Sequence, residues 1–410
     1  MISFPWHRVP TRFADFVHES AWFLPVVAAS IGVAAGVATT SADYEPVLGT
    51  VRVTVDRERD TLVAALALLF TGLSIVLSVG LSSIQNVANR FSLRLMSVIL
   101  RGLETRLVVS VFVVALAFVV TAQVRLRSAD SDAPASPLTL LVGFVVVVLS
   151  GVAIIGYVGR ISQWMRADRT LARVQRTIRR ASTRGERARA HGRSIAAGDL
   201  EAPAGSTPVT VTTSGYLAAI DLTALRRHVR SRGSVLGIDA GIGDYVVPGV
   251  VVGWVEPAPS PQELARIENA VQILAHRPPT NDPTYGLRII TDMALSALSP
   301  AVNDPYTAVQ AIETLTAVLT DLARRPTGPH AITDATGNGR VLVSSPGMAD
   351  YVHLSTDEIL VYGVHDPTVM RALDRCAREV QRCALTDDDR DVATDLRVRI
   401  AASQADPTTA

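Results

Sequence analysis

Lysine is absent from the 410-residue chain, so all 39 strongly basic side chains are arginine. Without a lysine amine, the protein cannot form a lysine Schiff base or carry a lysine-attached cofactor. Cysteine is scarce, because only Cys376 and Cys383 are present, seven residues apart in a segment predicted to be helical. This spacing is neither a CxxC motif nor a zinc pattern, and we therefore expect buried structural thiols.

Recognisable catalytic motifs are also lacking. The chain has no nucleophile elbow, no phosphate-binding loop and no dinucleotide fingerprint. We therefore expect no cofactor, and catalysis is not the expected function. The net charge is only +1, so no overall electrostatic field favours nucleic acid as a partner.

Long apolar runs are what the first 160 residues do contain. A helix needs about 20 mostly apolar residues to cross a bilayer. Four runs meet this requirement, at residues 20–40, 61–82, 107–122 and 138–158. None of the four contains a charged residue, which argues against an ion-coupled pump or a proton relay.

The placement of arginine predicts how these spans are oriented. The loop after the second span carries Arg90, Arg94, Arg101 and Arg106, and eleven arginines lie between residues 160 and 193. The other two loops balance their arginines with acidic residues. We therefore expect a multi-pass protein with both termini in the cytoplasm. The basic stretch after residue 160 is interpreted as an anchor at the inner surface, or as a helix that binds anionic lipids there.

Small residues recur at steps of four in the first span, at Ala28, Gly32 and Gly36. This spacing is typical of a face on which two membrane helices pack closely. We therefore predict that this side of the first span contacts another span.

The second span carries a stripe of polar side chains at steps of three or four residues. Its members fall within an arc of roughly 80° on one helix. They are Thr71, Ser74, Ser78, Ser82, Gln85 and Asn89. In one interpretation, these side chains allow close helix packing and bond back to their own carbonyls. In the other, several copies line a hydrated pore, and Arg90 and Arg94 at its inner mouth favour anions.

The rest of the chain is predicted to form a cytoplasmic α+β domain behind the four-helix transmembrane domain of residues 1–160. Residues 161–207 form a basic juxtamembrane helix and a linker, 208–257 a small β-rich module, and 258–404 a mostly helical domain. Helices are predicted over residues 222–232, 261–276, 287–298, 306–323, 367–384 and 388–403. Strands are predicted over residues 209–213, 235–239, 250–255, 341–344 and 359–364.

Two clusters of turn residues stand out between His276 and Ala308. They are Asn281-Asp282-Pro283-Thr284-Tyr285-Gly286 and Ser299-Pro300-Ala301-Val302-Asn303-Asp304-Pro305. The runs that contain them, Asn281–Leu287 and Asp292–Ala308, resemble the signature of the bacterial predicted membrane proteins grouped as DUF2254. Phe91-Ser92-Leu93-Arg94-Leu95 and Ser214-Gly215-Tyr216 resemble further motifs of the same family. Leu93 departs from the pattern, because a proline is expected there. The resemblance implies a protein of the bacterial plasma membrane and brings no established activity with it.

The same stretch supplies the candidate ligand residues of the cytoplasmic part, which are His276, Asp282, Asp292, Asn303 and Asp304. Their carboxylate and imidazole groups are suited to a metal or to acid–base chemistry. The alternative is structural, because Asp-Pro and Asn-Asp-Pro sequences commonly start helices with the side chain capping backbone amides. The cluster lacks a tight metal spacing such as HxxxH, which argues against a metal site. Whether these residues bind a metal is not decided by the sequence.

Our leading hypothesis is an oligomeric channel or passive transport protein with a cytoplasmic domain that gates or assembles it. The rival hypothesis is a membrane-anchored scaffold or ligand sensor without a pore, and a membrane enzyme that uses the Asp/His cluster is a third. A pore built from several copies needs a symmetric assembly. We therefore expect a homo-oligomer in the lipid bilayer, with no nucleic acid partner.

Overall fold

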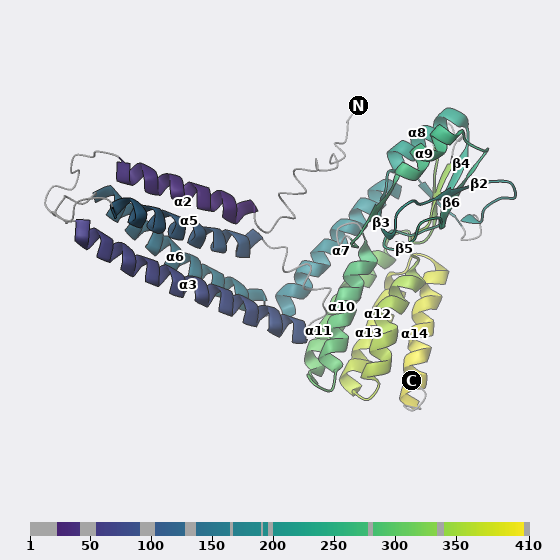
Figure 1. Cartoon of the computed structure of the whole chain (residues 1–410). Coiled ribbons are helices and arrows are strands. Elements are labelled where there is room, and N and C mark those ends of the chain that lie inside the picture. Colours follow the sequence, from purple (N-terminus) through teal and green to yellow (C-terminus); the bar gives the residue numbers. More distant parts are fainter. Residues whose placement is uncertain are drawn as a thin grey trace. The chain divides into compact units, whose positions relative to one another are not determined.

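The computed structural model describes residues 23–41, 55–90, 103–127, 137–164, 167–189, 192–195, 200–277, 282–333 and 340–405 (Figure 1). The chain divides into two compact units. Among the described residues, those from 23 to 164 except Asn89 and Arg90 form the first unit, and Asn89, Arg90 and the residues from Ala167 onward form the second. The N-terminal unit is helical, and the C-terminal unit contains both helices and sheets.

The N-terminal unit contains the long helices α2 (Phe23–Ser41), α3 (Val55–Arg90), α5 (Leu103–Leu126) and α6 (Pro137–Trp164). Among the described residues, four stretches are long and apolar enough to cross a membrane: Phe23–Ser41, Val55–Gln85, Arg106–Leu126 and Leu138–Arg160. They coincide with the four predicted spans. Helix α3 has 36 residues. At 1.5 Å per residue it is about 54 Å long, well beyond the ~30 Å hydrocarbon core.

Small residues let α2 pack tightly on α5, as the spacing predicts. Ala28, Gly32 and Gly36 are buried on one side of α2. A methyl group at Gly32 would overlap the Val114 carbonyl and lie 2.8 Å from the Ala117 side chain, so only glycine permits this approach. Helices α3, α5 and α6 share an apolar core, against which Ala35 of α2 packs partly buried.

Two antiparallel or mixed sheets form one part of the C-terminal unit. The larger sheet has the strand order β1-β8-β9-β4-β6-β2, in which only β4 and β9 run parallel. Its strands are β1 (Gly192–Ser194), β2 (Thr207–Thr210), β4 (Val235–Ile238), β6 (Val251–Glu256), β8 (His330–Thr333) and β9 (Arg340–Val343). The smaller sheet has the order β5-β3-β7, with β3 (Gly215–Ile220), β5 (Tyr245–Val246) and β7 (Val271–Leu274). Helices α8 (Leu222–Arg232) and α9 (Pro261–Asn269) pack against these strands.

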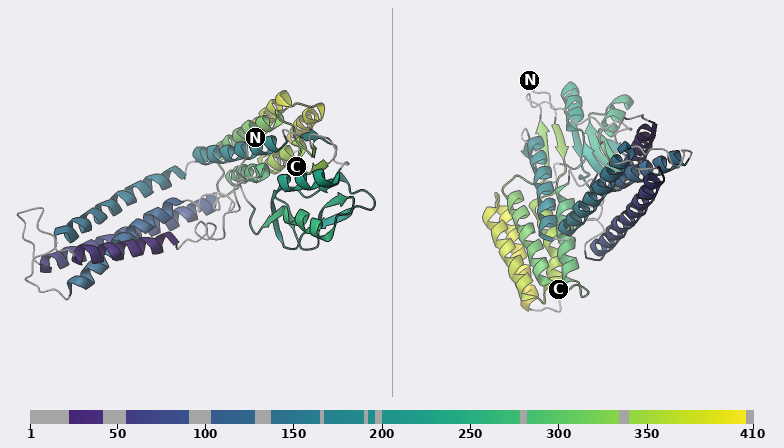
Figure 2. Two further views of the ribbon diagram at one scale, coloured as in Figure 1. Left: turned by 90° about the horizontal axis from the view of Figure 1, so that it is seen from above. Right: turned by 90° about the vertical axis from the view of Figure 1, so that its left-hand side faces the viewer.

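A layered helical bundle forms the other part of the C-terminal unit (Figures 1 and 2). Its helices are α7 (Ala167–Arg189), α10 (Pro283–Leu298), α11 (Pro305–Ala323), α12 (Met348–Gly363), α13 (Pro367–Cys383) and α14 (Asp387–Ala405). Helix α7 packs on α10 and α11, this pair packs on α12 and α13, and α14 covers the second pair. Helices α7 and α14 are therefore the outer layers on opposite sides of the bundle.

Three helices of the bundle begin in the same way. Asp282, Asp304 and Asp366 are the N-cap residues of α10, α11 and α13, and a proline follows each of them. The aspartate accepts hydrogen bonds from exposed amides of the first turn, and proline suits a position where no amide donor is needed.

Several sequence-based expectations are wrong. The helix predicted over 261–276 ends at Asn269, because Val271–Leu274 pairs with β3 as strand β7. The strand predicted over 359–364 belongs mostly to α12, where Ile359 and Leu360 are buried in the bundle. Tertiary packing here overrides the preference of β-branched residues for strands. Strand β8 was not predicted, whereas β9 confirms the strand predicted over residues 341–344, and both strands belong to the larger sheet.

Candidate functional site

The polar stripe of α3 faces away from the core of the N-terminal unit. Its described side chains, Thr71, Ser74, Ser78, Ser82 and Gln85, are all exposed. The opposite side of α3 is buried and contributes Leu62, Leu69 and Val76 to the core. The stripe is therefore not used for packing inside its own unit. The side chains of Asn89 and Arg90, and the whole of Arg94, lie outside the described residues.

Two hydroxyl groups of the stripe bond back to their own helix. Thr71 Oγ1 donates to the Ala67 carbonyl at 2.9 Å, and Ser74 Oγ donates to the Phe70 carbonyl at 2.9 Å. A hydroxyl satisfied in this way tolerates an apolar environment, and it still offers oxygen lone pairs to water or an ion.

The same face of α3 continues toward the start of the helix as small or polar residues. Ala67, Ala64 and Asp60 are exposed and follow the stripe at steps of three or four. At 1.5 Å per residue, the face from Asp60 to Gln85 is about 37 Å long, which exceeds the ~30 Å hydrocarbon core. Sequence reasoning missed this extension, because alanine carries no polar signal.

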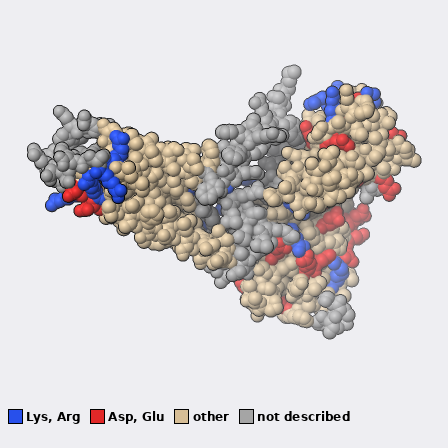
Figure 3. All heavy atoms as spheres, in the orientation of Figure 1, with Lys and Arg blue, Asp and Glu red and all other residues tan. Residues whose placement is uncertain are grey.

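The charged residues just before the second predicted span were expected to lie in a loop, but they form the first turns of α3. Arg59 Nε donates to the Leu126 carbonyl at 3.1 Å, and Gln123 Nε2 donates to the Arg59 carbonyl at 2.7 Å. Arg125 donates to Ser41 Oγ at 2.6 Å. These bonds tie together the ends of α2, α3 and α5. On the face shown in Figure 3, the charged side chains of this unit gather at one end, and the length of the helices carries none.

In the first turn cluster of the C-terminal unit, Asp282 is a buried helix cap. Its side chain is held by Arg277, whose Nε donates to Oδ2 at 2.6 Å, and by the amide of Thr284 at 2.9 Å. The Arg277 guanidinium also lies 5.9 Å from the ring centre of Tyr285. Gly243 in the turn before β5 has a φ of +100°, and a methyl group there would lie 2.7 Å from Arg277 Nε. Glycine therefore lets this turn close over the ion pair.

In the second turn cluster, Asp304 caps α11. It accepts hydrogen bonds from the Thr307 hydroxyl at 2.6 Å and from the Thr307 amide at 3.1 Å. These bonds lower the pKa of Asp304, so the capping carboxylate is stabilised in its charged form. Asn303 is exposed and has a φ of +46°, and its amide donates to the Ser299 carbonyl at 2.8 Å. An asparagine tolerates this left-handed conformation better than most residues.

The remaining candidates do not join these two caps. Asp292 accepts from Arg288 Nε at 2.9 Å, and Arg288 also donates to Glu358 on α12, which raises the pKa of Arg288. His276 is exposed beyond the end of β7. At 1.5 Å per residue, Asp282 and Asp292 are about 15 Å apart along α10, and Asp304 follows its other end. Within the described part of the chain, no group of three or more His, Cys, Asp and Glu residues is arranged to hold a metal ion.

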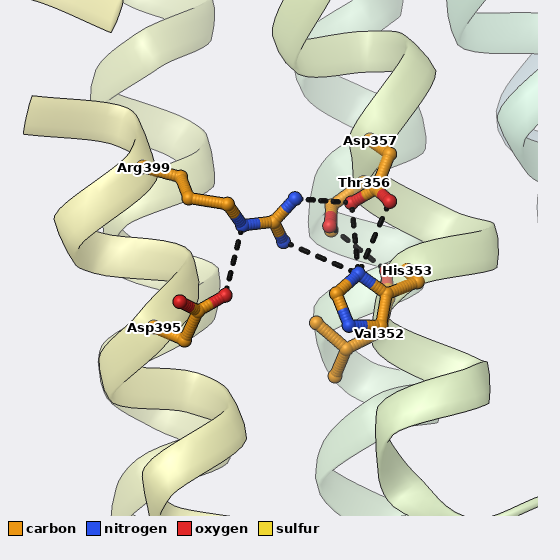
Figure 4. Close-up of polar contacts among 6 residues, drawn as sticks. All are labelled: Val352, His353, Thr356, Asp357, Asp395 and Arg399. Carbon is orange, nitrogen blue, oxygen red and sulfur yellow. Dashed lines mark hydrogen bonds and ion pairs between the residues drawn. The ribbon is translucent and has the colours of Figure 1, made fainter. Parts of the chain in front are cut away.

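A further polar cluster, which the sequence analysis did not single out, fastens α14 to α12 (Figure 4). Arg399 Nη1 donates to Asp357 at 2.8 Å, and Arg399 Nε lies 3.0 Å from Asp395. His353 Nδ1 lies 3.1 Å from the same Asp357 carboxylate. In the sequence, the only sign of this cluster is the i, i+4 spacing of His353 with Asp357 and of Asp395 with Arg399. The neighbouring Thr356 hydroxyl donates to the Val352 carbonyl of its own helix, so the bridge between the two helices is the Arg399–Asp357 pair.

The basic helix after the last span, α7, uses its apolar side to bind the bundle. Leu171, Val174 and Ile178 are buried where α7 packs on α10 and α11. Ile178 packs directly over Gly286 of the first turn cluster. The apolar side of α7 is therefore occupied within the C-terminal unit, and its arginines face outward.

These features define a protein with four candidate membrane-spanning helices joined to a mixed α/β unit. The chain belongs to the family described as predicted membrane protein (DUF2254), whose model matches residues 18–379. Similar proteins include the uncharacterized proteins MT1328 and Rv1290c of two Mycobacterium tuberculosis strains and Mb1321c of Mycobacterium bovis. Each is 26% identical over 406 residues, which cover 95% of this chain and 77% of the relative. No solved structure matches.

Proposed function

We propose that the protein is an oligomeric channel or passive transport protein of the bacterial plasma membrane. Several copies of α3 surround a hydrated path, and the C-terminal unit, on the cytoplasmic side, assembles or gates it. The observation that supports this proposal is the outward direction of the polar stripe, while the opposite side of α3 forms the core.

The chemistry of the face explains the preference for a pore over a lipid contact. A span that faces only hydrocarbon gains free energy from large apolar side chains and none from serine or threonine. The face of α3 from Asp60 to Gln85 is small or polar at every helical step, and large apolar side chains such as Leu77 and Leu81 lie to its side. Hydroxyl oxygens at this spacing suit a path for water and ions. Arg90 and Arg94 follow the stripe, and we propose that they favour anions.

A scaffold or ligand sensor without a pore is the second candidate. It is favoured by large exposed side chains on the bundle, where Tyr306 is 72% and Tyr362 is 65% exposed. Exposed aromatic residues of this kind are frequent at protein interfaces. This candidate requires no path along α3, so a flux measurement separates the two.

The test is ion flux into liposomes that contain the purified full chain. We expect a chloride flux that exceeds the potassium flux and that falls at least about tenfold in Ser78→Leu, because leucine fills the path with hydrocarbon. The matched control is Leu77→Phe, which enlarges an exposed apolar residue at the same depth but outside the stripe. The absence of flux in the wild type, or an equal loss in both variants, would contradict the channel proposal.

A further inference from the structure

Helix α7 presents a stripe of arginine on the side opposite its buried face. Between residues 169 and 183, where its side chains are described, it carries five exposed arginines and no acidic residue. Arg169, Arg173, Arg176 and Arg180 fall within an arc of roughly 60°, opposite the buried Leu171, Val174 and Ile178. The stripe is about 16 Å long.

Helix α14 presents a matching acidic stripe. Asp387, Asp388, Asp391 and Asp395 are exposed and fall within an arc of roughly 100°, on the side opposite the buried Ala393, Leu396 and Ile400. At 1.5 Å per residue, this stripe is about 12 Å long. Aspartates at the start of a helix are favoured by its dipole, but Asp391 and Asp395 extend the stripe beyond the first turn.

Within the described residues, the arginines of the α7 stripe and two of the four aspartates of the α14 stripe have no ion-pair partner, whereas Asp387 pairs with Arg390 and Asp395 pairs with Arg399 at 3.0 Å. Most arginines on α13 and α14 pair with a nearby acid, for example Arg397 with Asp374 at 3.2 Å. Among the residues that the structure describes, none of the five α7 arginines forms an ion pair, and neither does Asp388 or Asp391.

The two stripes lie on opposite outer layers of the same bundle, because α7 covers α10 and α11 while α14 covers α12 and α13. Complementary faces on opposite sides of one molecule cannot meet within it, but they can meet between copies. Such head-to-tail contacts are heterologous, and they close into a ring when the rotation between copies allows it.

We infer that the arginine stripe of α7 binds the acidic stripe of α14 on a neighbouring copy of this chain. This inference rests on the proposed oligomeric function and names the contact that sets the order of copies around the ring. A second copy fits better than an unrelated acidic partner because one chain supplies both halves of the contact, at similar lengths and with opposite charge.

A charge swap tests the inference in the full chain in detergent. One variant carries Arg173→Glu with Arg176→Glu, a second carries Asp388→Arg with Asp391→Arg, and a third combines all four changes. The readout is the oligomeric mass across a range of protein concentrations. Each single-stripe variant should need at least about tenfold more protein to assemble, because two attractions become repulsions. The four-fold variant should recover the wild-type mass. An equal mixture of the first two must alternate around the ring, so it should recover that mass when the number of copies is even.

A matched control carries Arg227→Glu with Arg230→Glu on α8. It makes the same change of charge at two exposed arginines outside the proposed contact, and its mass should stay that of the wild type. High salt should weaken wild-type assembly, because charge pairs at the surface are screened. Single-stripe variants with unchanged mass, a combined variant that fails to recover, or a wild-type monomer would each overturn the inference.

Vesicle binding tests whether the arginine stripe of α7 binds lipid headgroups instead of a second copy of the chain. If the α7 variant keeps its mass but loses binding to vesicles that contain phosphatidylglycerol, the arginine stripe binds lipid headgroups and the inference is wrong. The two proposals fail separately. If the oligomeric mass responds to the charge swap but the protein conducts no ions, the contact between copies is supported and the channel is not. If ion flux depends on Ser78 but the oligomeric mass does not respond to the charge swap, the channel is supported and this contact is not.

Discussion

Replacing Gly286 with alanine tests how α7 is attached to the bundle. A methyl group at this position would overlap Cγ1 of Ile178 and lie 2.8 Å from its Cδ1. Ile178 is buried between α7 and α10, so its side chain has little room to move. Overpacking of this kind costs about 2 kcal/mol. Alanine is favoured over glycine inside a helix by about 1 kcal/mol, which leaves a net loss of about 1 kcal/mol.

The sign of this effect should reverse when Ile178 is shortened. In an Ile178→Ala background the overlapping atoms are gone, and the next atom, Cβ, is 3.7 Å from the added methyl group. Ile178→Ala alone should destabilise the protein by about 2–4 kcal/mol, because it leaves a cavity. Adding Gly286→Ala should then stabilise the protein by about 1 kcal/mol, through helix propensity and partial filling of the cavity.

Thermal unfolding of the four proteins in detergent, all at one scan rate, measures this cycle. Buried Trp254 on β6 supplies a fluorescence signal from the C-terminal unit. Each 1 kcal/mol corresponds to roughly 2–4 °C in a unit of this size. Gly286→Ala should therefore lower Tm by that amount in the wild type and raise it in the Ile178→Ala background. A change of the same sign and size in both backgrounds would refute the close packing of α7 on Gly286.

Three further predictions concern the C-terminal unit. Asp282→Ala should lower Tm more than Asp282→Asn. Both variants remove the buried charge, but asparagine keeps the helix cap, which is worth about 1 kcal/mol. Equal losses of Tm in the two variants would contradict the capping role. Hydrogen bonds from the Ser260 amide and hydroxyl lower the pKa of Glu263 to about 2 from 4.5. A lowered folded pKa adds stability above pH 4.5 that is lost as the pH falls toward 2, so Glu263→Gln should flatten this part of the unfolding curve against pH. Burial raises the pKa of the Cys376 thiol to about 11, so alkylation of the folded protein, read by peptide mass spectrometry, should modify Cys383 alone.

The parts of the fold that the sequence predicts well depend on local patterns. The four spans follow from length and hydropathy, and the starts of α11 and α13 follow from Asp-Pro pairs that cap a helix. Helix α8 matches its predicted range because Asp221 caps its start and Gly233 ends it in a left-handed conformation.

The parts that the sequence misses depend on distant partners. The sequence of residues 359–364 predicts a strand, but most of this segment is helical because Ile359 and Leu360 are buried in the bundle as part of α12. The short apolar run of β7 cannot be distinguished from the end of a helix by its sequence alone. It forms a strand because it pairs with β3, which lies about 55 residues earlier in the chain. The candidate site has the same limit. The arc of Ser74 and Ser78 is visible in the sequence, but only the packing of α3 shows that this face points away from the core.

The proposed channel requires that the polar face of α3 borders water inside an assembly of several copies. Its most direct test places single cysteines at Ser78 and, as the control, at exposed Leu77 in the full chain reconstituted in liposomes. A charged, membrane-impermeant thiol reagent is added on both sides, and peptide mass spectrometry reads each position apart from the native cysteines. If a water-filled path runs along this face, Ser78→Cys should be modified rapidly and Leu77→Cys should be protected. Protection at both positions would contradict the proposed channel, because the stripe would then face lipid or protein without a path for water.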